Sequence, residues 1–413
     1  MQLEKNNCMS VNFENIIDAT KKLKGNIKQT PIVQASKLSE KLGCDLYLKL
    51  ESLQLTSSFK TRGSFIAIKK ICEKSPGKGV IAMSAGNHAQ AVAYHAKNLN
   101  VPATIIMPEQ APFSKVARTK ELGAEVILKG RTLNETNEYV NELAKVKNLS
   151  LIHPYNNEDV INGQGSIGIE FFDEIKDLDY FLVPIGGGGL ISGISTALKK
   201  LQPKIKIFGV ESNLYPSTFN KFNNKQLPCL GDTIADGIAV KSPGDLTYPI
   251  IKKLVDDIFL VDEISIEHSI SSLFEEERII SEGAGAAGIA AIFSNIDFFK
   301  HKKVGTVICG GNIDSRIFAE ILNKQLSRDG KLARIRIGIT DEPGMLAKIS
   351  NAIAKNGGNI IEIYHQRMFH DVPVKKAKID AVIEAQNTTN INEIINTLKC
   401  DNFEVTIVNE NSS

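Results

Sequence analysis

The chain has 413 residues, which predicts two or three domains at roughly 150 residues each. Hydrophobic residues make up 42% and charged residues 23% of the chain, close to the average for globular proteins, which excludes a disordered chain, a fibre and a membrane-embedded bundle. The 49 Lys and Arg residues against 47 Asp and Glu leave a formal charge of +2. We therefore expect a small-molecule ligand, and neither nucleic acid nor a membrane as a partner.

Targeting signals and metal-binding patterns are not visible in the sequence. The amino terminus MQLEKNNCMSVNFENI lacks the pattern of a secretory signal or a transit peptide. No run reaches the roughly 18 apolar residues of a membrane span. The 6 Cys residues show no C-x-x-C spacing, which disfavours a zinc site and a disulfide framework. We expect a cytoplasmic protein in a reducing compartment.

Short apolar runs alternate with helical patterns from about residue 80 onward. The runs include VIAMSA, VPATIIMP and GAEVILKG, and the same rhythm returns with YFLVPI, KIKIFGVES and KVGTVICGG. Each run is nearly continuous instead of alternating with polar residues, as expected for parallel strands buried on both faces. The sequence therefore predicts an α/β fold with helix-covered parallel sheets.

Beyond the polar connector RDGKL the pattern predicts a separate small unit. Residues 333–339 alternate apolar side chains with arginines, which predicts a strand with one wet face. A helix is expected in DEPGMLAKISNAIAKNGG, with Pro343 in its first turn and Leu346, Ile349 and Ile353 as its apolar stripe. Two strands, a helix and a last strand are expected in the order 359–369, 375–385, 390–400 and 403–408. This βαββαβ order is ferredoxin-like.

The segment SSFKTRG places Lys60 after small polar residues and before Gly63. One interpretation is a surface lysine at the start of a helix. The other is a lysine that forms a Schiff base, whose amine must be neutral to react. Burial and a neighbouring cation lower a lysine pKa. In that case we expect Phe59 to exclude water and Arg62 to supply the positive charge.

The segment SAGNHAQ lies where a buried strand gives way to a helix. Backbone N–H groups and the positive end of the helix dipole at such a junction favour an anion, here a substrate carboxylate. In the alternative interpretation Ser84 only caps the helix and Gly86 only forms a turn. That alternative leaves Asn87 and His88 without a role.

Four consecutive glycines, 186–189, follow one predicted strand and precede a helix. Such a loop lets backbone amides surround a phosphate with no Cβ in the way. A dinucleotide site is an alternative, because Glu211 lies 22 residues after Gly189. A plain flexible turn is disfavoured, because four glycines are entropically costly.

Cys309 ends an apolar strand and is followed by Gly310, Gly311 and Asn312. A free cysteine is often only a small core residue. Its place at the carboxyl end of a strand, where open α/β sheets bind ligands, favours a site residue. Glu282, in ISEGAGA, is either a surface carboxylate or a pocket residue.

Taken together, SSFKTRG, SAGNHAQ, GGGGL, TIADGIAVKSPG and CGGN occur in an order and spacing that resemble the fold type II pyridoxal-phosphate enzymes, specifically the threonine dehydratase (threonine ammonia-lyase) family. The tail, with DEPGMLAKI and NGGNI, resembles an ACT regulatory domain. The resemblance implies a fold like that of the tryptophan synthase β subunit, with a catalytic domain over 1–326 and a ferredoxin-like ACT domain over 331–413. Two three-layer α/β lobes are implied, a large one of 1–52 and 157–326 and a small one of 53–156.

The resemblance also implies pyridoxal 5′-phosphate as the cofactor. Lys60 is then the lysine that binds it covalently, Asn87 contacts its phenolic oxygen, and Cys309 faces its pyridine nitrogen. A thiol donates a hydrogen bond to a neutral pyridine without adding charge, which favours elimination over transamination. The implied cofactor-binding residues are Phe59, Lys60, Asn87, Gly186, Gly187, Gly188, Gly189, Leu190 and Cys309. The implied substrate-binding residues are Ser84, Ala85, Gly86, Asn87 and His88.

The reaction implied is the deamination of L-threonine to 2-oxobutanoate and ammonia by β-elimination, and of L-serine to pyruvate, with Lys60 taking the α-proton. Serine racemase or another pyridoxal-phosphate β-eliminating enzyme is the alternative. Racemases carry a serine where this chain has Ala85, so we expect little racemase activity. A catalytically silent amino-acid sensor is the alternative that is not an enzyme. The sequence does not distinguish a role in isoleucine biosynthesis from a catabolic role.

The ACT resemblance implies an amino-acid effector, isoleucine or valine, bound between paired copies of the domain. The implied allosteric residues are Asp341, Pro343, Gly344 and Asn359, although Pro343 and Gly344 alternatively only shape a helix start. Pairing implies a homo-oligomer, either a dimer or a tetramer. Some relatives bind a cation at a position that Glu211 matches, but Ser217 stands where an Asp is expected, so no metal is predicted.

Overall fold

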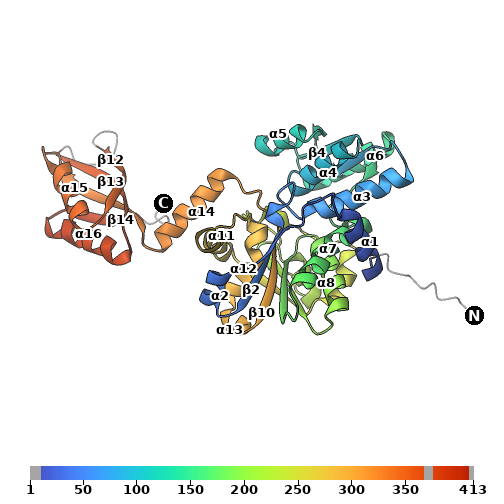
Figure 1. The fold of residues 1–413 in the computed structure, drawn as a ribbon. Coiled ribbons are helices and arrows are strands. Elements are labelled where there is room, and N and C mark those ends of the chain that lie inside the picture. Colours follow the sequence, from blue (N-terminus) through green and yellow to red (C-terminus); the bar gives the residue numbers. More distant parts are fainter. Residues whose placement is uncertain (1–10, 367–374, 409–413) are drawn as a thin grey trace, which may run out of the picture. The chain divides into compact units, whose positions relative to one another are not determined.

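The computed structural model describes residues 11–366 and 375–408, and the chain forms two compact units, Met1–Ile313 and Asp314–Ser413. Each unit is described by itself (Figure 1). The sequence placed the boundary between residues 326 and 331, whereas helix α14 (Ser315–Arg328) groups with the second unit. It does so because α14 packs against β11 (Leu332–Thr340), the strand that follows it.

The first unit contains two sheets, whose strands are parallel apart from β1. In the described residues the larger sheet has six strands in the order β1-β2-β10-β7-β8-β9, parallel except for β1. Its strands are Ile32–Gln34 (β1), Asp45–Leu50 (β2), Tyr180–Pro184 (β7), Lys206–Ser212 (β8), Asp257–Val261 (β9) and Lys303–Ile308 (β10). The apolar runs YFLVPI and KIKIFGVES became β7 and β8, which are buried over nearly their whole length, as the continuous patterns predicted.

A smaller sheet lies within the same unit, between β2 and β7 in the sequence. Over the described part of the chain its four parallel strands have the order β5-β4-β3-β6. They are Val80–Met83 (β3), Ala103–Met107 (β4), Glu125–Leu128 (β5) and Ser150–Leu151 (β6). The two sheets confirm the predicted α/β fold.

Helices surround both sheets of the first unit. Helix α12 (Gly283–Ser294) packs on the strands of the large sheet and is almost entirely buried, whereas α4 (Asn87–Asn98) and α6 (Leu133–Val146) pack on the small sheet. The other helices are Phe13–Leu23 (α1), Ser36–Leu42 (α2), Lys60–Lys74 (α3), Phe113–Glu121 (α5), Glu158–Glu174 (α7), Gly189–Leu201 (α8), Ser217–Asn223 (α9), Thr247–Leu254 (α10), Glu263–Glu277 (α11) and Ile296–Phe299 (α13), with 3₁₀ turns at Glu51–Leu53 (η1) and Asp236–Ile238 (η2).

The second unit contains an antiparallel sheet with the strand order β12-β13-β11-β14. Its further elements are Met345–Lys355 (α15), Asn359–Gln366 (β12), Lys376–Glu384 (β13), Thr388–Cys400 (α16) and Glu404–Ile407 (β14). This confirms the predicted βαββαβ order. The part of the predicted second strand over residues 367–369 lies outside the described residues.

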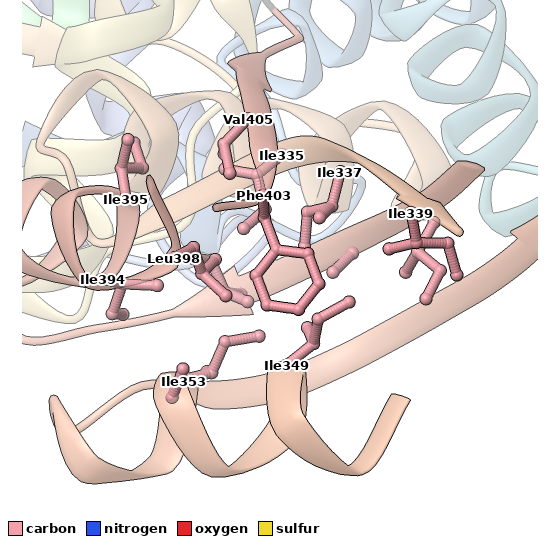
Figure 2. Packing of buried hydrophobic residues seen from close by; sticks show 14 of the residues in the cluster. Ile335, Ile337, Ile339, Ile349, Ile353, Ile394, Ile395, Leu398, Phe403 and Val405 are labelled. Carbon is pink, nitrogen blue, oxygen red and sulfur yellow. The ribbon is translucent and has the colours of Figure 1, made fainter. Parts of the chain in front are cut away.

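The core of the second unit lies between this sheet and its helices (Figure 2). Ile335 and Ile337 of β11 face Ile349 and Ile353 of α15 and are fully buried. The predicted strand with one wet face is therefore confirmed. Two details differ: Leu346 is 42% exposed, and α15 begins at Met345, so that Pro343 precedes the helix instead of lying in its first turn.

Among the described residues, none of the helices combines the length and apolar character that crossing a membrane requires.

Candidate functional site

Lys60 is the first residue of α3, and the segment before it is held against the end of β10. The backbone N–H of Phe59 donates to the carbonyl of Cys309 at 3.0 Å, and that of Gly311 donates to the carbonyl of Ser57 at 2.9 Å. Ser58 pairs with Gly310 in an antiparallel bridge. These main-chain contacts bring Lys60 beside Cys309, although the two are far apart in the sequence.

The Lys60 amine lies in a partly buried position. Its Nζ donates to the carbonyl oxygen of Pro154 at 2.8 Å and lies 5.0 Å from the centroid of the Phe59 ring. Loss of hydration lowers the pKa of Lys60 to about 8, while the nearby Cys309 and Glu282 act in the opposite direction. A substantial fraction of this amine is therefore neutral near pH 8, as a nucleophile or a base requires.

The expectation that Arg62 lowers the Lys60 pKa is wrong. Arg62 is fully buried, and its guanidinium is paired with the carboxylates of Glu51 and Glu170. These two acids neutralise its charge. The pKa of Lys60 is lowered first by lost hydration.

Asn87, at the start of α4, belongs to a chain of hydrogen bonds beside Lys60. Its Nδ2 donates to Oε1 of Glu282 at 2.7 Å, and its Oδ1 accepts from Nδ2 of Asn312 at 2.6 Å. Asn312 also donates to the carbonyl of Thr56 at 3.0 Å. The structure thus shows that Glu282 is buried and bonded to Asn87 and is not a surface carboxylate, a question that the sequence had left open. It also adds Asn312, for which the CGGN motif was the available signal.

Glu282 is buried, and this burial raises its pKa to about 7, with the Asp236 carboxylate adding to the effect. Its backbone N–H donates to the carbonyl of Gly310 at 3.0 Å. A Cβ at Gly310 would lie 2.2 Å from Oε1 of Glu282, so a side chain there would displace this carboxylate. Near neutral pH the carboxyl holds a proton for part of the time.

The residues 84–88 form the turn into α4. The Ser84 hydroxyl accepts from the backbone N–H of Gly86 at 3.1 Å, and Gly86 is the N-cap residue. Ala85 is only partly buried and packs at the edge of the small-sheet core. The turn precedes the N-terminus of α4, a helix of 12 residues, and the N-terminus carries the positive end of the helix dipole.

Two histidines near Lys60 are neutral. His88 is buried, and lost hydration together with the Lys60 charge lowers its pKa to about 3. Its Nε2 lies 2.8 Å from the carbonyl of Ile152 and must carry the proton, because a carbonyl only accepts. Burial and Lys60 also lower the pKa of His153 to about 4. The turn 152–156 could not be predicted from the sequence, because it contributes the main-chain carbonyls of Ile152 and Pro154, which any residue type offers.

The loop Gly186–Gly189 ends in the first turn of α8. Gly188 has a φ of +91° and is the N-cap residue, a conformation that side chains rarely adopt. A Cβ at Gly187 would lie 2.2 Å from Cγ of Tyr155, and one at Gly186 would lie 3.0 Å from the carbonyl oxygen of Gly237. Leu190 follows in the helix and is buried. At Gly187 and Gly188 the loop therefore has room for backbone alone.

Cys309 directly follows β10 and is 2% exposed. Burial, and then the negative charge of Glu282, raise its pKa well above the usual value. The group is thus a neutral thiol that donates a weak hydrogen bond.

Glu211, which matches a cation-binding position of some relatives, is bonded to the start of α9. Its carboxylate accepts from the backbone N–H groups of Thr218 and Phe219 at 2.9 and 2.8 Å, at the start of α9, and burial raises its pKa to about 7. Ser217 lies 3.5 Å from it. Within residues 11–366 and 375–408, no group of three or more His, Cys, Asp or Glu side chains is arranged to hold a metal ion.

The four allosteric candidates lie in the second unit. The backbone N–H of Asp341 donates to the carbonyl of Lys375, and Gly344 is the N-cap of α15 with a φ of +89°. Asn359 begins β12 and pairs with Glu384, whereas Thr340, beside Asp341, pairs with Lys376. Asp341 and Asn359 thus lie at opposite ends of β13, which are about 26 Å apart at 3.3 Å per residue.

Comparison with known proteins identifies both units. Residues 23–310 match the family described as "Pyridoxal-phosphate dependent enzyme", and residues 333–399 match the ACT domain. A protein of Thermotoga maritima named L-threonine ammonia-lyase is 40% identical over 400 residues, which cover 96% of this chain and 100% of the relative.

Two solved structures resemble the first unit. Threonine deaminase isoform 2 from Solanum lycopersicum is 33% identical with a TM-score of 0.71, covering 76% of this chain and 88% of that one. Serine racemase from Dictyostelium discoideum is 36% identical with a TM-score of 0.69, covering 74% of this chain and 99% of that one.

The residues of this chain fit pyridoxal phosphate. The loop 186–189 leaves no room for a Cβ at Gly187 or Gly188 and leads into a helix N-terminus, which suits a phosphate group. Lys60 offers an amine with a lowered pKa, and Cys309 offers a neutral donor at the end of β10. Because the family match spans most of the first unit and the site carries the groups that its cofactor needs, the chain belongs to the pyridoxal-phosphate dependent enzymes and carries a C-terminal ACT domain.

Proposed function

We propose that the protein is a threonine ammonia-lyase, which converts L-threonine to 2-oxobutanoate and ammonia and L-serine to pyruvate. The observation that carries the proposal is the Lys60 amine, held by the Pro154 carbonyl at 2.8 Å beside Cys309 with a pKa of about 8. The similarity of the whole chain to a relative named L-threonine ammonia-lyase supports the substrate.

The proposed cofactor-binding residues come from the start of α3, the start of α4, the loop into α8 and the residue after β10. Pyridoxal phosphate, when bound, supplies an electron-withdrawing ring that makes the α-proton of an amino acid acidic. We assign its binding to Phe59, Lys60, Asn87, Gly186, Gly187, Gly188, Gly189, Leu190 and Cys309.

The proposed role of Lys60 has two parts, to hold the cofactor and to take the proton from Cα of the substrate. Its lowered pKa supports the second part, because a base works best when its pKa lies near the working pH. The Phe59 ring shields the amine from water. Cys309 stays protonated, so it orients a ring nitrogen by a hydrogen bond and adds no charge.

The substrate carboxylate is assigned to the N-terminus of α4. The turn and the positive helix end favour an anion, and the neighbouring Lys60 adds positive charge when protonated. The proposed substrate-binding residues are Ser84, Ala85, Gly86, Asn87 and His88.

Serine racemase is the second candidate, because a solved racemase is 36% identical. A racemase must return a proton to the opposite face of the substrate. Position 85 is alanine and offers no hydroxyl for that step. This supports elimination over racemisation.

The function is tested with the purified, cofactor-loaded protein. L-Threonine and L-serine are supplied separately, and 2-oxobutanoate, pyruvate, ammonia and D-serine are measured. We expect equal amounts of oxo acid and ammonia and little D-serine, and no turnover by the Lys60→Ala variant. D-Serine formed as fast as pyruvate would favour the racemase, and no turnover by the wild type would refute both enzymes and favour a silent sensor.

The ACT domain supports regulation by an amino acid, with isoleucine or valine as the proposed effector. Asp341, Pro343 and Gly344 lie at one end of the sheet, and Asn359 lies at the other. All four contribute to one binding site only when two copies pair. We therefore propose that the protein is a homo-oligomer, a dimer or a tetramer. Light scattering with and without isoleucine tests this oligomeric state. We also propose that the protein is cytoplasmic.

A further inference from the structure

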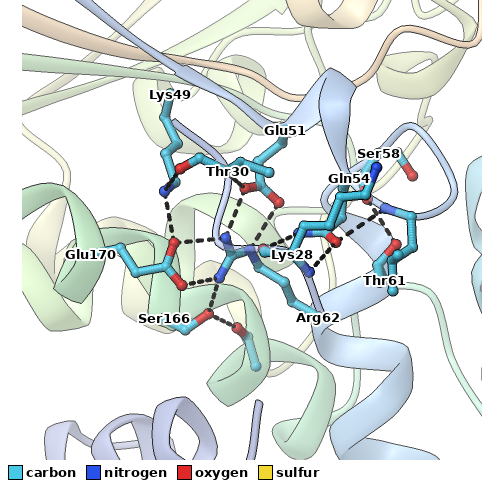
Figure 3. Close-up of polar contacts among 12 residues, drawn as sticks. Lys28, Thr30, Lys49, Glu51, Gln54, Ser58, Thr61, Arg62, Ser166 and Glu170 are labelled. Carbon is cyan, nitrogen blue, oxygen red and sulfur yellow. Dashed lines mark hydrogen bonds and ion pairs between the residues drawn. The ribbon is translucent and has the colours of Figure 1, made fainter. Parts of the chain in front are cut away.

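A buried network of charges surrounds Arg62 (Figure 3), which lies two residues after Lys60 in the first turn of α3. At its centre is Arg62, whose five N–H donors are all used. Nε and Nη2 donate to the two oxygens of Glu51, both at 2.8 Å, and Nη1 and Nη2 donate to the two oxygens of Glu170 at 2.6 and 2.8 Å. The fifth bond runs from Nη1 to the hydroxyl of Ser166 at 2.9 Å.

The network joins three separate parts of the first unit. Glu51 lies in η1 directly after β2, Arg62 lies in α3, and Ser166 and Glu170 lie in α7. Lys49 completes the charge balance, because its Nζ lies 2.7 Å from Glu170 and donates to the carbonyl of Thr30 at 2.7 Å. Two cations thus face two anions, and three of the four side chains are fully buried.

We propose that Arg62 is a positioning residue, which fixes the first turn of α3 to η1 and α7 and so holds the Lys60 amine at the Pro154 carbonyl beside Cys309. The proposal rests on the proposed role of Lys60. Lys60 and Arg62 are two residues apart in one helical turn, so their side chains leave the helix in different directions. A bidentate pair on each side of the guanidinium prevents rotation of that turn.

The shape of the guanidinium, and not its charge alone, carries this role. Arginine presents a planar fork that matches two carboxylates, whereas lysine presents a point charge with three donors. A lysine at position 62 would keep the charge and lose the fork. The Arg62→Lys variant therefore separates positioning from an electrostatic effect on Lys60.

The alternative is that the network serves stability alone. Buried ion pairs are weak grounds for stability, because desolvation offsets most of the attraction. Lys49 provides the matched control, since in the described structure it bonds to Glu170 and Thr30 and not to α3. A Lys49→Met variant disturbs the same network without releasing the helix that carries Lys60.

The test compares wild type, Arg62→Lys and Lys49→Met by two measurements. One is kcat and KM for L-threonine with the cofactor-loaded protein. The other is the pH midpoint of Lys60 labelling by an amine reagent in the cofactor-free protein, read by peptide mass spectrometry. For Arg62→Lys we expect kcat to fall by about 100-fold, as for a misplacement near 1 Å, with a smaller change in KM and a displaced labelling midpoint.

For Lys49→Met we expect lower thermal stability with kcat and the labelling midpoint of the wild type. Wild-type values of both quantities in Arg62→Lys, or the same losses in both variants, would overturn the proposal. If Arg62→Lys does not fold, Glu51→Gln takes its place, because a glutamine can accept only one of the two bonds that Arg62 donates to Glu51 and so breaks one bidentate pair. An unchanged kcat and labelling midpoint in that variant would overturn the proposal equally.

A failure of the proposed function is distinguishable from a failure of this inference. A wild type that does not turn over threonine refutes the function, whereas the labelling midpoint needs no cofactor and still shows whether Arg62 places the amine.

Discussion

At the scale of single residues, the site is defined by two ionisable groups whose pKa values shift toward each other. Lost hydration lowers the pKa of Lys60 to about 8 and raises that of Glu282 to about 7. Burial always disfavours the charged form, so it lowers the pKa of a base and raises the pKa of an acid. The two groups also interact, because a Glu282 carboxylate favours the ammonium form of Lys60.

The Glu282→Gln substitution tests this coupling. Removing the negative charge removes a contribution that raises the Lys60 pKa, so the labelling midpoint of Lys60 is expected to fall below its wild-type value of about 8. The glutamine oxygen still accepts from Asn87, which limits structural change. The midpoint is measured by amine labelling across pH in the cofactor-free protein.

Glu211→Gln is the matched control for that substitution. Glu211 is also buried, with a pKa also raised to about 7, but its carboxylate bonds to the start of α9. We expect this variant to keep the wild-type midpoint. A midpoint that rises or stays constant in Glu282→Gln would contradict the coupling.

At the scale of elements, the site is assembled where chain segments leave parallel strands. Cys309 follows β10, the glycine loop follows β7, and the turn into α4 follows β3. Parallel strands end at the same edge of a sheet, so the loops after β7 and β10 lie at one edge of the large sheet. The strand β3 belongs to the small sheet, and the turn that follows it is joined to the end of β10 by the hydrogen bonds of Asn87 to Glu282 and Asn312. The close packing of Gly187 on Tyr155 links the glycine loop to the turn that holds Lys60.

The Gly187→Ala substitution tests the packing of the loop. The added Cβ would lie 2.2 Å from Cγ of Tyr155, so the loop or the ring must shift. We expect at least a tenfold weaker affinity for pyridoxal phosphate, about 1.4 kcal/mol, measured by absorbance titration of the cofactor-free protein. Gly338→Ala is the control, because the nearest atom to its Cβ would be a carboxylate oxygen of Glu404 at 3.3 Å, which a small movement of that side chain relieves. Wild-type affinity in Gly187→Ala would show that the loop has spare room.

At the scale of the whole molecule, much of the architecture follows from the sequence. Continuous apolar runs predicted the parallel strands, and alternation over residues 333–339 predicted β11 with one wet face. Strand order was not predictable from these patterns, because β10 pairs with β2 across more than 250 residues. The Pro154 carbonyl and the partners of Arg62 were missed for a similar reason, since main-chain acceptors and contacts between distant elements leave no local signal.

The second unit offers a prediction about its independent core. Ile379 of β13 is fully buried among the residues of that core, so Ile379→Ala is expected to destabilise the unit by about 2–5 kcal/mol. Hydrogen exchange of the β11 and β13 amides measures the loss. Turnover without effector is expected to be unchanged, and the response to isoleucine to disappear.

Ile361→Ala is the control for this core substitution, because Ile361 is 52% exposed in β12. Its cost is expected to stay within about 0.5 kcal/mol. Equal exchange rates in the two variants would show that Ile379 does not stabilise the sheet.

The most direct test of the account is to identify the residue that binds the cofactor. The protein is loaded with pyridoxal phosphate, treated with borohydride to make the link irreversible, digested and analysed by mass spectrometry. The account predicts that the modification lies on Lys60, in the peptide that carries SSFKTRG, and that it is absent from Lys60→Ala. Modification of a different lysine in the wild type, or of none, would contradict it.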